Sequence, residues 1–238
     1  MKKKYKFLSF LLALLLLLPL AVQSVAADSE EQSEELPDSW FDDALFIGDS
    51  LTGSLTTYNL IYGGLGNAKL IHVNGLACHN IIRKQQQVIY AGQAYRIEDA
   101  VAVSGARKLY LMLAMNDIGT AINILEDSWK KVLERIQEKN PTVQIYIQSG
   151  TPMRSDFAYF TKENMDEYNE LLKRICEEYN CTYVDVTDGL LDENGYMREE
   201  LRQDNVHMNT EGCAIWMQNL HRIACYSPSP LEERGEKS

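Results

Sequence analysis

Two short segments, far apart in the chain, carry residue types that act together in acyl transfer. Phe46-Ile47-Gly48-Asp49-Ser50-Leu51-Thr52 places a serine directly after an apolar run, and Asp204-Asn205-Val206-His207 places an aspartate three residues before a histidine. A serine hydroxyl, an imidazole and a carboxylate can serve as nucleophile, base and orienting group. The spacing of three lets the carboxylate hold Nδ1–H of the imidazole while Nε2 faces the serine. The pattern predicts chemistry at Ser50.

Two further polar positions follow apolar runs in the same way. Gly75, in Val73-Asn74-Gly75-Leu76, could bring a backbone N–H close to an oxyanion. Asn116, in Ala114-Met115-Asn116-Asp117, would place an amide side chain nearby. Each has a simpler interpretation: Ser50 as a helix N-cap, Gly75 as a turn glycine and Asn116 as a capping residue.

The apolar pattern predicts the elements that must position these residues. Short runs rich in β-branched or aromatic residues alternate with helical patterns, which favours an α/β fold with a parallel sheet covered on both faces. In such sheets ligands bind beyond the carboxyl ends of the strands, where Ser50 would lie. The five expected strands are Ala44–Ile47, Lys69–Val73, Lys108–Leu113, Val143–Gln148 and Thr182–Val186.

Helical faces and one hairpin complete the pattern. Gln87–Tyr90 and Gln93–Ile97 alternate polar and apolar residues around Ala91-Gly92, which indicates a β-hairpin before a helix that begins near Glu98. Two helical faces are also expected, with Asn140-Pro141 ending the first helix and Thr161 capping the second. Their apolar positions are Leu125, Trp129, Val132, Leu133 and Ile136, and Met165, Tyr168, Leu172, Ile175 and Tyr179.

Taken together, the four blocks resemble the SGNH hydrolases, also called the GDSL esterase/lipase family, whose blocks carry Ser, Gly, Asn and His in that order. The resemblance runs from about residue 45 to about residue 224. It implies a three-layer, flavodoxin-like fold with a parallel sheet of about five strands. It also implies that Ser50 is the nucleophile, His207 the base and Asp204 its orienter. The implied oxyanion hole consists of the Ser50 N–H, the Gly75 N–H and the Asn116 side chain.

The resemblance implies a serine esterase that needs no metal and no organic cofactor. The third block usually begins with glycine, and Ala114 at that position would narrow the crevice but leave the amide donor of Asn116 in place. We expect short acyl groups, above all acetyl, on a carbohydrate or similar polar alcohol. A lipase or lysophospholipase-type acylhydrolase and an O-acyltransferase acting on a cell-surface glycan remain alternatives, as does a noncatalytic surface-binding protein on the same fold.

The terminal segments and the net charge of the chain indicate where the protein acts and which partners it excludes. A basic start, the apolar run of residues 7–18 and Val25-Ala26-Ala27 predict a signal peptide over residues 1–27 and a secreted protein, against the alternative of a retained membrane anchor. An acidic linker is expected over residues 28–40, the hydrolase domain over 41–226 and a flexible tail over 227–238. Without residues 1–27 the net charge moves from −11 to about −15, which argues against nucleic acid and anionic membranes as partners.

Several other residues have open roles. Cys176 and Cys181 flank the expected end of a helix, so they form either a disulfide or a pair of buried small apolar side chains. The aromatic residues of 157–160 either line the acyl or sugar site or pack on the core. Asp117 is expected to bond neighbouring backbone, and Asp49 to do so or to tune the turn. His72, His79 and His221 are expected to be packed or surface side chains.

Export can be tested on secreted material. We predict cleavage after Ala27, so mass spectrometry should find Asp28 at the amino terminus of the mature protein, because the small residues at positions 25 and 27 fit a signal peptidase site. Membrane-bound protein that retains Met1 would contradict this prediction.

Overall fold

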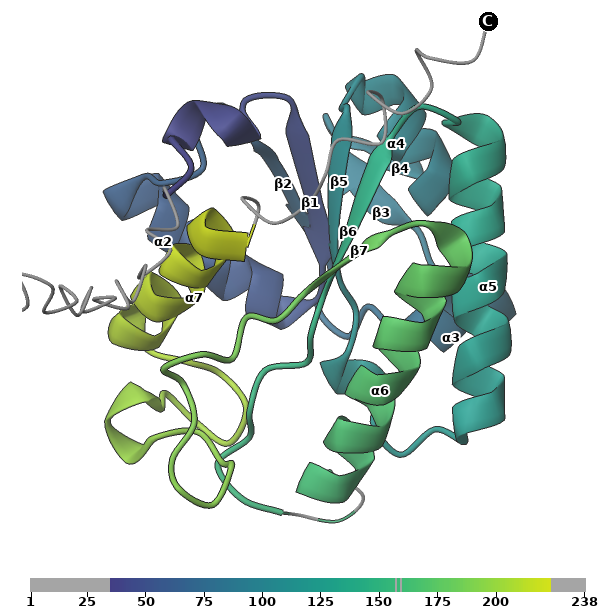
Figure 1. The fold of residues 1–238 in the computed structure, drawn as a ribbon. Helices are drawn as coiled ribbons and strands as arrows, with labels where there is room; N and C mark the ends of the chain where they lie inside the picture. The colour runs from purple at the N-terminus through teal and green to yellow at the C-terminus, as the bar shows by residue number, and fades with distance from the viewer. Residues whose placement is uncertain (1–34, 157, 159, 224–238) are drawn as a thin grey trace, which may run out of the picture. The chain divides into compact units, whose positions relative to one another are not determined.

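A five-stranded parallel sheet forms the centre of the structure, a computed structural model that describes residues 35–156, 158 and 160–223. The strand order is β2-β1-β5-β6-β7 (Figure 1). The predicted α/β fold with a parallel sheet of about five strands is confirmed. The strands are β1 Ala44–Gly48, β2 Lys69–His72, β5 Lys108–Met112, β6 Gln144–Gln148 and β7 Thr182–Val184.

The strands are apolar along their length because helices cover both faces of the sheet. All five residues of β1 are buried. Three aromatic rings at matching register positions lie stacked across neighbouring strands. The ring centroids of Phe46 and Tyr110 are 4.5 Å apart, and so are those of Tyr110 and Tyr146. This stack ties β1, β5 and β6 together in the middle of the core.

Helices form a layer on each side of the sheet (Figure 1). Helices α2 and α7 pack together on one side, whereas α4, α5 and α6 cover the other, with α3 against α5. The alternation of strands and helices along the chain therefore produces the expected three layers. The helices are α2 Ser50–Tyr62, α3 Cys78–Arg83, α4 Ile97–Ser104, α5 Ile122–Lys139, α6 Lys162–Tyr179 and α7 Thr210–Ile223.

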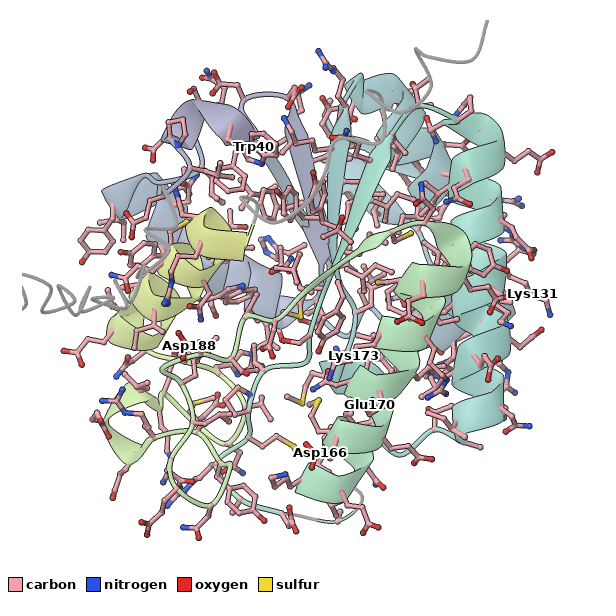
Figure 2. The ribbon with its side chains drawn as sticks, in the orientation of Figure 1. Trp40, Lys131, Asp166, Glu170, Lys173 and Asp188 are labelled. Atoms are coloured by element: carbon pink, nitrogen blue, oxygen red, sulfur yellow. The ribbon has the colours of Figure 1, made fainter. Side chains whose placement is uncertain are left out.

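The two long helices bury the faces that their periodicity predicts. All five expected apolar positions of α5 are buried, as are four of the five in α6, while Tyr179 is half-buried. Charged side chains such as Lys131, Glu170 and Lys173 lie on exposed parts of these helices (Figure 2). Thr161 caps α6, because its Oγ1 accepts a hydrogen bond of 3.1 Å from Asn164 N.

Helix α6 ends before Asn180, whose backbone has the left-handed conformation, and this ending brings Cys176 and Cys181 close together. Asn180 has φ +53°, and the backbone N–H groups of Asn180 and Cys181 both donate to Cys176 O. This is a Schellman arrangement, in which the residues at the positions of Cys176 and Cys181 commonly touch. Both side chains are thiols in the structure, Cys176 buried and Cys181 half-buried.

The predicted hairpin is formed by β3 Val88–Tyr90 and β4 Gln93–Tyr95. Ala91 and Gly92 both have positive φ, at +49° and +80°, as a tight two-residue hairpin turn requires.

Near the start of the described chain, the 3-10 turn η1 Asp38–Phe41 begins within the range expected to be a linker. The Phe41 side chain is buried there, which anchors this turn to the sheet.

Strand order brings three loops to one edge of the sheet. β1 lies between β2 and β5, so the segments after these three strands, which carry Ser50, Gly75 and Asn116, emerge side by side. Gly48 at the end of β1 has no room for a side chain, because a Cβ there would lie 2.6 Å from Met112 O.

Among the described residues, no helix is long and apolar enough to cross a membrane. The expected signal peptide and the tail of residues 227–238 lie outside the described residues.

Candidate active site

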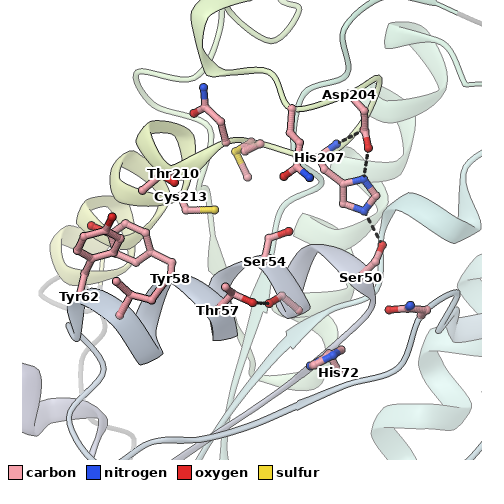
Figure 3. Close-up of a pocket in the computed structure, with 16 residues that line it drawn as sticks. Ser50, Ser54, Thr57, Tyr58, Tyr62, His72, Asp204, His207, Thr210 and Cys213 are labelled. Atoms are coloured by element: carbon pink, nitrogen blue, oxygen red, sulfur yellow. Dashed lines mark hydrogen bonds and ion pairs between the residues drawn. The ribbon is translucent and has the colours of Figure 1, made fainter.

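Ser50, His207 and Asp204 form a continuous hydrogen-bonded row at the carboxyl edge of the sheet (Figure 3). Ser50 Oγ lies 2.9 Å from His207 Nε2, and His207 Nδ1 lies 2.8 Å from Asp204 Oδ2. The two halves of the row are separated by 157 residues in sequence. The order of contacts is the one that the sequence predicts, with the imidazole between hydroxyl and carboxylate.

Ser50 occupies the first turn of α2, but it does not cap the helix. The N-cap is Asp49, whose side chain accepts a hydrogen bond of 2.9 Å from Leu51 N. The simpler interpretation of Ser50 as a capping residue is therefore wrong, because the neighbouring carboxylate takes that role. The Ser50 hydroxyl is left to contact His207.

The loop that carries Asp204 and His207 is held by the Asp204 carboxylate. Its Oδ1 accepts hydrogen bonds from Val206 N and His207 N at 2.9 and 2.8 Å, while its Oδ2 faces the imidazole. Partial burial would raise the pKa of Asp204, but these backbone donors and the imidazole outweigh it and hold the pKa below its ordinary value. The carboxylate therefore stays ionised and can orient His207 at neutral pH.

Asn116 and Gly75 lie on the loops after β5 and β2. Asn116 Nδ2 donates to Asp49 Oδ2 at 2.8 Å and, more weakly, to Leu76 O at 3.3 Å. This is not the role of a helix cap. Gly75 has φ +74° in a turn closed by a 2.9 Å bond from Leu76 N to Val73 O, so the interpretation as a turn glycine fits its backbone.

A second buried carboxylate joins the loops that carry Gly75 and Asn116. Asp117 accepts hydrogen bonds from Cys78 N at 2.8 Å, His79 N at 3.3 Å and His79 Nδ1 at 2.6 Å. We expected Asp117 to bond neighbouring backbone, and this was wrong: its backbone partners lie 38 and 39 residues away, because β2 and β5 flank β1. Burial raises the pKa of Asp117, against the hydrogen bonds that lower it.

Asp49 is fully buried next to these residues and is strongly perturbed. Burial raises its pKa to about 6, although the hydrogen bonds from Leu51 and Asn116 and the nearby His207 all act to lower it. An ionised Asp49 has no N–H or O–H to donate, so it fixes which end of the Asn116 amide faces it. Asp49 therefore sets the orientation of the amide beside Ser50.

A shallow cleft of about 560 Å³ opens at Ser50 and runs between α2 and α7 (Figure 3). Its floor is one face of α2, and its wall continues from the histidine loop into α7. Tyr58 and Tyr62 lie at the far end, with ring centroids 4.9 Å apart. The lining residues are Ser50, Gly53, Ser54, Thr57, Tyr58, Ile61, Tyr62, His72, Asn74, Gln203, Asp204, His207, Met208, Asn209, Thr210 and Cys213.

Sequence reasoning missed this aromatic end and the pairing of His79. Tyr58, Leu60, Ile61 and Tyr62 follow one another at the end of α2, and three of the four are more than 60 % exposed in the structure. Nothing in the sequence connects His79 with a carboxylate 38 residues away. His221 is buried between two backbone carbonyls, as expected for a packed histidine.

Other expected features are placed as follows. His72 is exposed and lines the cleft. Ala114 is buried in the core and does not line the cleft between α2 and α7. Phe160 is half-buried against the core, whereas Phe157 and Tyr159 lie outside the described residues. The part of the chain that the structure describes contains no cluster of three or more His, Cys, Asp or Glu residues suited to a metal ion.

Solved structures with the same fold show modest sequence identity. A candidate acylhydrolase from Bacteroides fragilis matches with a TM-score of 0.63 and 14% identity, over 85% of this chain and 95% of that one. A GDSL-like lipase from Bacteroides thetaiotaomicron has a TM-score of 0.58 and 13% identity, over 74% of this chain and 84% of that one. An acetyl-xylooligosaccharide esterase from Geobacillus has a TM-score of 0.53 and 17% identity, over 77% of this chain and 94% of that one. No curated protein matches the sequence.

The fold and the family model together define a serine-type carboxylic ester hydrolase. The model of the GDSL-like lipase/acylhydrolase family matches residues 46–215. The chain belongs to this family, as its resemblance to the GDSL enzymes predicts.

The raised pKa of Asp49 predicts a pH-dependent stability. A carboxyl that binds its proton more tightly in the folded state stabilises the fold at low pH, and this contribution is lost as pH rises through about 6. Relative to Asp49→Asn, the free energy of unfolding of the wild type should fall by roughly 2 kcal/mol between pH 4 and pH 7, because folding raises this pKa from 3.8 to about 6. Urea unfolding of both proteins across this range measures the difference, and a constant difference would contradict the prediction.

Proposed function

We propose that the protein is a secreted serine esterase that removes short acyl groups, chiefly acetyl, from a carbohydrate or similar polar alcohol. Ser50 is the nucleophile, His207 the general base and Asp204 the residue that orients it. The observation that carries this proposal is the unbroken row from Ser50 Oγ through the imidazole to Asp204, with contacts of 2.9 and 2.8 Å.

In the first step, His207 Nε2 accepts the proton of Ser50 as Oγ attacks the ester carbonyl carbon. The tetrahedral intermediate collapses when the imidazolium returns this proton to the oxygen of the departing alcohol. A water molecule, deprotonated by the same nitrogen, then attacks the carbonyl carbon of the acyl-enzyme. The second tetrahedral intermediate breaks its bond to Ser50 Oγ, the imidazolium returns the proton to this oxygen, and the acid leaves. Asp204 keeps the other ring proton on Nδ1 throughout, so Nε2 is always the nitrogen that faces the reacting atoms.

The negative charge on the tetrahedral oxygen requires donors fixed in advance. We assign this role to the Ser50 N–H, the Gly75 N–H and the Asn116 amide. Asn116 Nδ2 donates to Asp49 Oδ2 over 2.8 Å and makes a longer contact of 3.3 Å with Leu76 O. An oxyanion can replace Leu76 as acceptor while Asp49 keeps the amide in place.

The lining of the cleft supports a neutral polar alcohol. Among the described residues that form it, none is lysine or arginine, the side chains that commonly bind phosphate groups. Neutral hydrogen-bonding side chains instead predominate, among them Ser54, Thr57, Asn74, Gln203 and Thr210. This composition fits sugar hydroxyls better than the headgroup of a phospholipid. The acetyl-xylooligosaccharide esterase with this fold is consistent with such a substrate.

Secretion is part of the proposal and rests on the basic and apolar start of the chain. An extracytoplasmic location would expose the cleft to cell-wall or other polysaccharides rather than to cytoplasmic metabolites.

Substitutions in the row should separate the roles of its members. Ser50→Ala and His207→Ala should lower kcat for 4-nitrophenyl acetate by on the order of a millionfold, and Asp204→Ala by about 10⁴-fold. Asn116→Ala should cost about 10² to 10³, as expected for one oxyanion donor. Steady-state kinetics measure these changes, with the exposed and remote Ser39→Ala as control. Wild-type turnover by Ser50→Ala would refute the mechanism.

Substrate preference should follow the neutral cleft. Across a series of 4-nitrophenyl esters, kcat/KM should be highest for acetate and fall with chain length, and acetylated xylan should be deacetylated faster than phospholipid vesicles are hydrolysed. A steady rise of kcat/KM from acetate to long acyl chains would instead support the lipase alternative.

A further inference from the structure

We propose that the cleft between α2 and α7 binds the alcohol side of the substrate, and that Tyr58 and Tyr62 at its far end bind a second sugar of an oligosaccharide chain. This inference rests on the proposed function, since it extends the same site. The substrate would be an acylated oligosaccharide or polysaccharide rather than an acylated monosaccharide.

The positions of the general acid and of the oxyanion donors decide which half of the ester, the acyl group or the alcohol, lies in the cleft. His207 Nε2 must reach the leaving alcohol oxygen in order to protonate it. The cleft opens between Ser50 and His207, and its wall continues through the residues that directly follow His207, including Met208 and Thr210. Two of the three assigned oxyanion donors, Gly75 and Asn116, do not line the cleft, and the third is the backbone N–H of Ser50 at the end of the cleft. The carbonyl oxygen therefore points out of the cleft and the alcohol into it.

The length of the cleft exceeds the reach of a single esterified group. Ser50 and Tyr62 are twelve residues apart on the same helix, which corresponds to about 18 Å along its axis. Ser54 and Thr57 lie between them on the floor, and Figure 3 shows their hydroxyl groups along the path from Ser50 to the tyrosines. A substrate whose alcohol side contacts both Ser50 and the tyrosines must therefore be longer than one sugar.

The chemistry of the far end fits a sugar ring. Tyr58 and Tyr62 present two neighbouring ring systems, and 62 % of the Tyr62 surface is exposed. An aromatic face binds the C–H face of a pyranose, and the phenol O–H can bond a hydroxyl group at its rim. Thr57 and Thr210 add neutral polar groups along the cleft, and none of the described lining residues is lysine or arginine. A neutral polyhydroxylated chain satisfies both parts of this surface.

The test compares peracetylated cellotriose with peracetylated glucose, so that the acetyl position does not limit either substrate. The ratio of kcat/KM for the trisaccharide to kcat/KM for the monosaccharide should fall about five- to tenfold in Tyr62→Ala and in Tyr58→Ala. Tyr62→Phe should keep most of the wild-type ratio, because the ring face remains. Leu60→Ala is the matched control: it lies on the same helical turn, is 81 % exposed and lies outside the cleft.

An unchanged ratio in both tyrosine variants would overturn the proposal. So would a wild-type enzyme with no preference for the trisaccharide, or a Tyr62→Ala loss confined to long-chain acyl esters, which would place an acyl chain in the cleft.

Binding without turnover separates this proposal from the esterase mechanism. In a Ser50→Ala background, calorimetry should show that Tyr62→Ala weakens the binding of cellotetraose, whereas Leu60→Ala does not. If the wild type lacks Ser50-dependent turnover of 4-nitrophenyl acetate, the proposed function fails but the binding difference still decides the sugar subsite. Equal binding by the two variants would count against the subsite alone.

Discussion

The buried carboxylate of Asp49 performs two tasks that the rest of the site depends on. It caps α2 through Leu51 N, which leaves the Ser50 hydroxyl available to His207, and it holds the Asn116 amide at 2.8 Å. Both tasks need an acceptor at the junction of β1 and α2. Burial disfavours the ionised form of Asp49 and raises its pKa to about 6. The ionised carboxylate that the site uses therefore lowers the free energy of unfolding near neutral pH.

Sheet topology makes these contacts possible. Since β1 lies between β2 and β5, the segments after all three strands meet. A second buried carboxylate, Asp117 after β5, binds the first residues of α3, which follows the loop after β2. The two aspartates thus connect three loops without any covalent link. Helix α7 then places the His207 loop over Ser50 by packing on α2, and the same packing forms the cleft.

Much of the fold was predictable because its signals are local. The apolar runs gave all five strands, the faces of α5 and α6 followed from helical periodicity, and Ala91-Gly92 marked the hairpin. The meeting of Ser50 with His207 was also predictable, since both follow the pattern of one known family and topology brings strand ends together.

The missed features all depend on contacts between distant segments. The pairing of His79 with Asp117 joins two loops that share no sequence signal, and the aromatic end of the cleft exists only because α7 lies beside α2. Asp49 was expected to bond nearby backbone, and it does, but its bond to Asn116 crosses 67 residues. Local patterns specify secondary structure, whereas these contacts are set by packing.

The central claim is that Ser50 is an activated nucleophile, and covalent labelling tests it most directly. Diisopropyl fluorophosphate reacts with a serine whose hydroxyl is deprotonated by a neighbouring base, whereas an ordinary serine is inert. Peptide mapping by mass spectrometry should find one adduct, on Ser50, in the wild type and none in His207→Ala. An adduct on another serine, or no adduct in the folded wild-type protein, would contradict the account.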